Sequence, residues 1–182
     1  MVVVISVGYL HQRYSIPRSA IAVVYAYSAV ILEPMTKPDL IRFLDAQDQI
    51  YAQVVEELTN GRKQTHWMWF IFPQIAGLGR STMTQHYAIR DLDQARRYLA
   101  DSILGHRLRE VVRLMINHNG KSALEILGSP DDMKLRSSLT LFREAASNES
   151  DRALFTEALD QFYGGEADAR TLELLGLVSS RS

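Results

Sequence analysis

The chain contains no cysteine, which excludes disulfide bonds, thiol nucleophiles and cysteine-based zinc or iron–sulfur sites. Any metal would have to be held by histidine and carboxylate side chains. The five histidines show no spacing of three or four residues among themselves, so no metal site is predicted and no cofactor is expected. A chain without cysteine suits a reducing compartment, and we therefore expect a cytoplasmic protein.

The chain also has little net charge and no long apolar run. Its 20 basic and 21 acidic residues leave a net charge of −1, which argues against a protein that coats nucleic acid or an anionic membrane. This balance still leaves room for a local basic site. The apolar stretch at residues 20–32 is shorter than the roughly 20 residues that span a bilayer, so no membrane partner is expected.

Residues 1–34 differ from the rest of the chain, because they hold a single acidic residue, Glu33, and two apolar runs. Three explanations are open: an extension produced by a start site upstream of a native start at Met35, a signal peptide, or an additional element. No clean cleavage site follows the apolar run, which argues against the signal peptide. We favour the first explanation, so that one domain covers residues 35–176 and a tail covers 177–182.

From Thr36 onward the spacing of apolar residues is helical almost everywhere, and alternation with a period of two is nearly absent. Capping residues predict helices that start near Thr36, Asp91, Asp101, Ser122, Ser129, Asp151 and Asp168. Glycines predict the ends of three of them, at Gly61, Gly128 and Gly164. The sequence thus predicts an all-α single domain, a bundle of about six to eight helices, with Glu56 and Glu57 on a solvated helix face.

Both tryptophans lie in the run His66-Trp67-Met68-Trp69-Phe70-Ile71-Phe72-Pro73-Gln74. Buried aromatic side chains remove on the order of 150–250 Å² each from water, so the run forms either the centre of the core or the wall of a pocket. One ring can serve the core while the other faces a cleft and stacks on a flat ligand together with Tyr87. His66, at the edge of the run, is the candidate acid or base, and a structural role is its alternative.

Two polar clusters supply further candidates. In the segment Gly77-Leu78-Gly79-Arg80-Ser81, the glycines let a ligand approach the backbone closely, the guanidinium of the arginine offers several donors, and the serine can start a helix. Together these features favour the binding of an anion. A plain turn between helices is the alternative. Lys134, Arg136 and Ser137 form the second cluster, for which pairing between helices is the alternative.

These motifs resemble a bacterial family known as domain of unknown function 1810. The resemblance continues through Tyr87-Ala88-Ile89, Gly128-Ser129-Pro130-Asp131-Asp132 and Thr171-Leu172-Glu173-Leu174-Leu175-Gly176. It covers about Met35 to Gly176 and leaves residues 1–34 without a counterpart. It implies a small, mostly helical domain and supplies no activity. Such proteins are sometimes labelled calpastatin-like, but those inhibitory segments are disordered, whereas this chain has the apolar spacing of a core.

Together, these features predict one cleft, walled by Trp67 or Trp69, that binds a small anionic or nucleotide-like ligand. The predicted ligand-binding residues are Trp67, Trp69, Gln74, Gly79, Arg80, Ser81, Tyr87, Lys134, Arg136 and Ser137, and the candidate catalytic residue is His66. The alternative from another class is a structural or protein-interaction module with no small-molecule site. Whether the domain is an enzyme stays open, and nucleic acid is not an expected partner.

Overall fold

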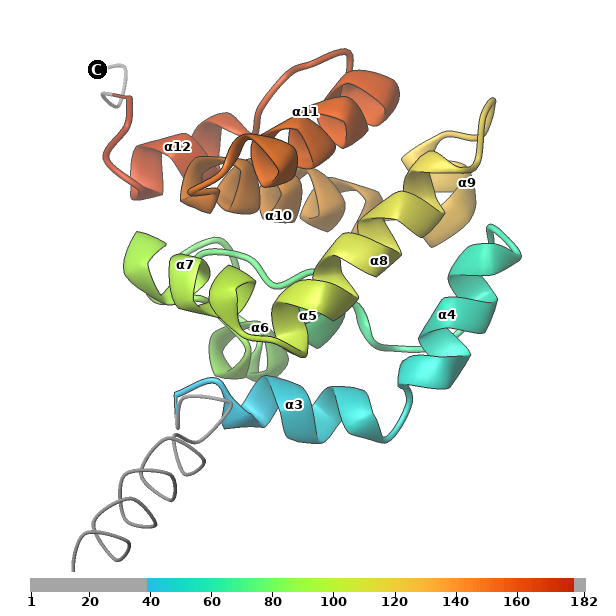
Figure 1. Cartoon of the computed structure of the whole chain (residues 1–182), viewed down its shortest axis with the longest axis horizontal. Coiled ribbons are helices and arrows are strands. Elements are labelled where there is room, and N and C mark those ends of the chain that lie inside the picture. The colour runs from blue at the N-terminus through green and yellow to red at the C-terminus, as the bar shows by residue number, and fades with distance from the viewer. Residues whose placement is uncertain (1–38, 179–182) are drawn as a thin grey trace, which may run out of the picture. The chain divides into compact units, whose positions relative to one another are not determined.

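The computed structural model describes residues 39–178, in which ten helices follow one another (Figure 1). The first four are α3 (Ile41–Asp48), α4 (Tyr51–Thr59), α5 (Met68–Ile71) and α6 (Thr82–His86). The other six are α7 (Leu92–Ala100), α8 (Leu104–Ile116), α9 (Ala123–Leu127), α10 (Asp131–Ala145), α11 (Glu149–Tyr163) and α12 (Ala169–Leu174). No strand occurs among these residues, where a single isolated bridge joins Ile75 and Ile89. The predicted all-α class is confirmed, with more helices than predicted.

The predicted extension at residues 1–34 lies outside the described residues, as do the predicted cap at Thr36 and most of the predicted tail. Residues 36–182 group as one unit of the chain, and the description below concerns that unit alone. None of the helices in its described part is long and apolar enough to cross a membrane.

Helix α10 contacts α7, α9, α11 and α12, and α8 packs against α4, α7 and α11 (Figure 1). Aromatic rings run through the core from one helix to the next. Phe43 of α3 packs edge-on against Tyr98 of α7, with ring centroids 5.2 Å apart. Tyr98 lies 5.3 Å from Phe142 of α10, which lies 6.0 Å from Phe155 of α11. The core therefore joins helices from both ends of the described chain.

Local capping chemistry sets several helix ends as predicted. The side chains of Ser81, Asp91, Ser122 and Asp168 each accept a hydrogen bond from the backbone N–H three residues ahead and begin α6, α7, α9 and α12. Gly164 ends α11 with a φ of +62°, a left-handed conformation that glycine adopts without steric cost.

Four predicted helix boundaries are wrong. One is the start at Asp101, because α8 begins at Leu104 after an N-cap at Ile103. The single helix expected before Gly61 is two helices, because the chain turns at Gln49 and Ile50, so that α3 packs on α5 and α4 on α8. Helix α10 follows Pro130 and lacks the predicted cap from Ser129. Helix α11 is capped by Asn148 and begins before Asp151, whose carboxylate instead pairs with Arg109 of α8 at 2.6 Å.

The prediction that Glu57 is solvated is also wrong, because this residue is only 4% exposed. Its Oε2 accepts hydrogen bonds from the backbone N–H of Gln64 at 2.8 Å and of Thr65 at 3.1 Å, and from the indole N–H of Trp67 at 2.8 Å. Its Oε1 accepts from the Thr65 hydroxyl at 2.7 Å and the Gln53 amide at 3.2 Å. Burial alone would raise the pKa of Glu57, but the hydrogen bonds from Gln64, Thr65 and Trp67 together hold it below its ordinary value. This carboxylate fastens the connection between α4 and α5.

Candidate ligand-binding site

Two histidines share a cavity of about 600 Å³, which we call the histidine cavity. His66 precedes α5 and His86 ends α6, and neither imidazole forms a hydrogen bond within residues 39–178. The remaining polar lining comes from α3 and the turn that follows it: Arg42, Asp45 and Gln49. The rings of Phe70 and Tyr87 form an aromatic wall with centroids 5.2 Å apart, and Ile41, Ala46 and Ile50 complete the lining.

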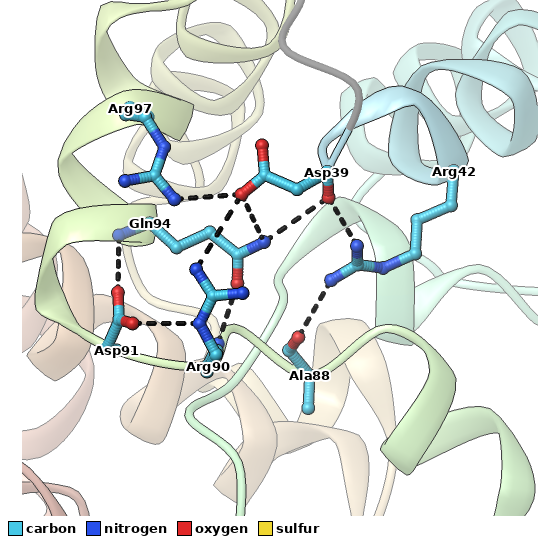
Figure 2. Close-up of polar contacts among 7 residues, drawn as sticks. All are labelled: Asp39, Arg42, Ala88, Arg90, Asp91, Gln94 and Arg97. Carbon is cyan, nitrogen blue, oxygen red and sulfur yellow. Dashed lines mark hydrogen bonds and ion pairs between the residues drawn. The ribbon is translucent and has the colours of Figure 1, made fainter.

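The cation of this cavity, Arg42, is anchored by the backbone. Figure 2 shows that its guanidinium turns toward two carbonyl oxygens, those of Asp39 and of Ala88, the latter at 3.0 Å. The carboxylate of Asp39 turns away from it and accepts from Arg97 at 2.8 Å and from the amide of Gln94 at 3.1 Å (Figure 2). Within residues 39–178 no carboxylate lies within ion-pair distance of Arg42.

Burial lowers the pKa of the Arg42 guanidinium, and the nearby Asp39 carboxylate partly opposes that shift. An arginine side chain stays protonated throughout the physiological range, so the cavity keeps a fixed positive charge beside it. The same guanidinium lies 4.5 Å from the ring centroid of Phe43, which adds a cation–π contact. The charge is therefore held at a defined position next to the aromatic wall.

The structure places the predicted site residues around two cavities and not around one. His66 and Tyr87 line the histidine cavity. Four others, Gln74, Gly79, Lys134 and Ser137, line a second cavity of about 240 Å³, which we call the lysine cavity. Each group belongs to a different pocket, so the single cleft that the sequence predicts is divided.

Of the predicted aromatic walls, Trp67 lies in the core. It is fully buried and its indole N–H donates to Glu57, which is the core position that the sequence left open as the alternative to a cleft wall. Trp69 is partly buried, and its ring lies 4.9 Å from the ammonium of Lys134. It therefore supports a lining residue of the lysine cavity through a cation–π contact.

Three further predicted residues line neither cavity. Arg80 is exposed, and Ser81 caps α6 through a 3.2 Å hydrogen bond from the backbone N–H of Thr84. Arg136 donates to the carboxylate and the carbonyl of Glu166, each at 2.9 Å, and so holds the segment before α12 against α10. This is the pairing between elements that the sequence left open as the alternative for the second cluster.

Sequence reasoning missed Arg42 and His86 as members of the site. Only contacts between residues far apart in the sequence identify these two residues. His86 lies 20 positions after His66, and Arg42 donates to the carbonyl of Ala88, 46 positions away. No helical spacing links such residues. Among the described residues, no group of three or more histidine and carboxylate side chains is arranged to hold a metal ion.

Comparison with known proteins finds a similar solved structure and a matching family model. It is similar to the conserved hypothetical protein Rv1873 from Mycobacterium tuberculosis, whose crystal structure matches with a TM-score of 0.73 and 47% sequence identity. The match covers 77% of this chain and 98% of that protein. No curated protein matches the chain. A family model described as a protein of unknown function matches residues 37–175, and the chain therefore belongs to the DUF1810 family.

Proposed function

We propose that this domain binds a small ligand that carries a negative charge next to a flat ring, and that the ligand occupies the histidine cavity. The observation that carries the proposal is the joint presence of a half-buried guanidinium, two histidines and two aromatic rings around one cavity. Its volume of about 600 Å³ lies within the range of small-molecule sites, roughly 300–1,000 Å³.

Each part of the lining supplies one kind of contact. Arg42 offers a permanent charge and planar donors that match a phosphate or carboxylate group. His66 and His86 add hydrogen-bonding ring nitrogens. The rings of Phe70 and Tyr87 suit a flat heterocycle, because offset or edge-on aromatic contacts are favourable.

The lining also contains polar side chains that are not basic. Asp45 and Gln49 carry hydrogen-bond acceptors, and Gln49 also carries donors. Groups of this kind can pair with the polar edge of a nitrogen heterocycle. A ligand built from a heterocycle and an acidic group, such as a nucleoside monophosphate, therefore suits this mixed lining better than a bare inorganic anion does.

The test is a binding screen of the full chain by thermal shift, followed by calorimetry. Nucleoside monophosphates and aromatic carboxylates form the first arm, and sugar phosphates, which lack the flat ring, form the second. A ligand at 100 times its dissociation constant adds about 2.7 kcal/mol of stability, which a thermal shift detects readily. We expect hits in the first arm and weaker ones in the second.

Variants locate the ligand that the screen finds. We expect His66→Gln, His86→Gln and Tyr87→Leu each to weaken binding by about tenfold, the loss expected from one hydrogen bond to a charged group or one ring contact. His106→Gln is the matched control, because His106 is exposed and lies outside the cavity. Unchanged binding in all three variants would refute the assignment.

The outcome also decides between the remaining functional classes. A catalytic role for His66 follows only if a bound ligand is turned over and His66→Ala abolishes turnover. A screen without hits on a folded protein would favour the structural or protein-interaction module. The cytoplasmic location predicted from the lack of cysteine stays a prediction.

A further inference from the structure

The lysine cavity is a second polar hollow, with lining residues that differ from those of the histidine cavity. Its walls come from three stretches of the chain: the segment from Gln74 to Thr84, the first turns of α10, and Asp168 before α12. Gly79 allows the first wall to form, because a Cβ atom there would lie 2.6 Å from the Cγ2 of Thr84. At about 240 Å³ the cavity is smaller than the sites that hold drug-sized ligands.

Among the lining residues, Lys134 has its ammonium group held in a fixed position. It lies 2.7 Å from Oδ1 of Asp131, while Lys63 lies 2.8 Å from Oδ2 of the same carboxylate. Burial alone would raise the pKa of Asp131, but its hydrogen bonds and charge interactions with Lys134 and Lys63 hold it below its ordinary value, so the carboxylate stays ionised. An ammonium group has three donors and Asp131 takes one, which leaves Lys134 able to bind an acceptor in the cavity.

Asp168, another lining residue, carries a free acceptor. Its Oδ2 takes both hydrogen bonds that cap α12, from the backbone N–H and the hydroxyl of Thr171, at 2.8 and 2.5 Å. Its Oδ1 accepts no hydrogen bond from residues 39–178. The side-chain amide of Gln74, which also lines the cavity, likewise has no hydrogen-bond partner among the described residues. Within this part of the chain, the lining residues thus include one carboxylate oxygen and one whole side-chain amide that have no hydrogen-bond partner.

We propose that the lysine cavity binds a free amino acid in its zwitterionic form. The ligand's carboxylate pairs with Lys134, its ammonium group pairs with Oδ1 of Asp168, and Gln74 hydrogen-bonds to its polar atoms. The charge balance favours a ligand with both signs, because Lys63 and Lys134 are matched by Asp131 and Asp168. A ligand with only one charge would pair with only one of Lys134 and Asp168. This site is independent of the function proposed for the histidine cavity.

The experiment is a calorimetric titration of the full chain with the free L-amino acids, one at a time. Two derivatives of the best binder follow: the N-acetylated form, which lacks the ammonium charge, and the amidated form, which lacks the carboxylate. We expect each derivative to bind about tenfold or more weakly, because each loses a hydrogen bond between charged groups. Equal binding of the N-acetylated form would overturn the proposal, since Asp168 would then have no role.

Pairs of matched variants test whether the amino acid binds at the lysine cavity. Asp168→Asn keeps a residue that caps helices well and removes the charge, and its control is Asp160→Asn at an exposed position on α11. Gln74→Ala is matched by Gln64→Ala, whose side chain is exposed and outside the cavity. We expect the first member of each pair to weaken amino-acid binding and the second to leave it unchanged.

Two further outcomes would overturn the proposal. One is the absence of binding by every amino acid to a folded chain. The other is a loss of amino-acid binding in His66→Gln, which would place the ligand in the histidine cavity. We expect His66→Gln to leave the amino-acid titration unchanged, so that this proposal and the one for the histidine cavity fail separately.

Discussion

Replacement of Glu57 by glutamine is expected to destabilise the domain strongly, although the two side chains have the same shape. Oε2 of Glu57 accepts three hydrogen bonds, from Gln64, Thr65 and Trp67. A glutamine can keep its oxygen at that position. At the other position its NH2 group can donate to the Thr65 hydroxyl and, once the exposed Gln53 amide turns over, to the oxygen of Gln53, so the geometry survives and the negative charge does not. Hydrogen bonds to charged groups contribute about 1 kcal/mol more than neutral ones, and three of them give a loss of about 3 kcal/mol.

Urea denaturation and thermal unfolding, followed by circular dichroism, measure this loss. For a domain of this size about 3 kcal/mol corresponds to a fall of roughly 10 °C in Tm. Glu56→Gln is the matched control, because Glu56 is exposed, and its free energy of unfolding should change by less than about 0.5 kcal/mol. A Glu57→Gln variant as stable as the wild type at neutral pH would refute the reasoning.

The dependence on pH gives an independent check. The folded state lowers the pKa of Glu57, so the stabilisation from its carboxylate is present above the unfolded pKa of about 4.3 and is lost as the pH falls through the folded value. Glutamine does not titrate. The difference in unfolding free energy between the wild type and Glu57→Gln should therefore shrink below about pH 4.3. A difference that stays constant into strong acid would show that the charge has no part in it.

Two further substitutions test the packing of α8. Arg109→Met should lower the free energy of unfolding, measured by urea denaturation, by about 3–5 kcal/mol. The reason is that it leaves the carboxylate of Asp151 without its partner, since this residue is only 5% exposed and pairs with both Nε and Nη2 of Arg109. A loss below about 1 kcal/mol would contradict the pairing. Gly105→Ala should lower Tm sharply, although alanine favours helices. The reason is that the new Cβ would lie 2.2 Å from the carbonyl oxygen of Leu99. An unchanged or raised Tm would contradict that close approach.

The helix caps show what the sequence can predict. Asp91, Ser122 and Asp168 begin their helices as expected, because a cap is a hydrogen bond between residues three apart and depends on little else. The turn at Gln49 and Ile50 was not predicted, because one apolar stripe fits both a long helix and two short ones that pack on different partners. Tertiary contacts decided between them.

The candidate sites were harder to predict for a related reason. The sequence singled out His66 and Lys134 and placed them in one cleft, whereas they line two different cavities. The partners that define each cavity, such as His86 for the first and Asp168 for the second, lie far away along the chain. The error at Glu57 has a similar origin, since acidic residues at a helix end are usually solvated, and no spacing rule indicates an indole N–H ten positions later.

The hydrogen bonds of Glu57 also bear on the order in which the domain assembles. All of their donors lie between four and ten positions further along or back in the chain. Closing so short a loop costs little entropy and takes place within about 10–100 ns, far faster than contacts between distant helices form. The hydrogen bond of the Trp67 indole is therefore a contact that can form early, whereas both cavities form only when remote segments meet.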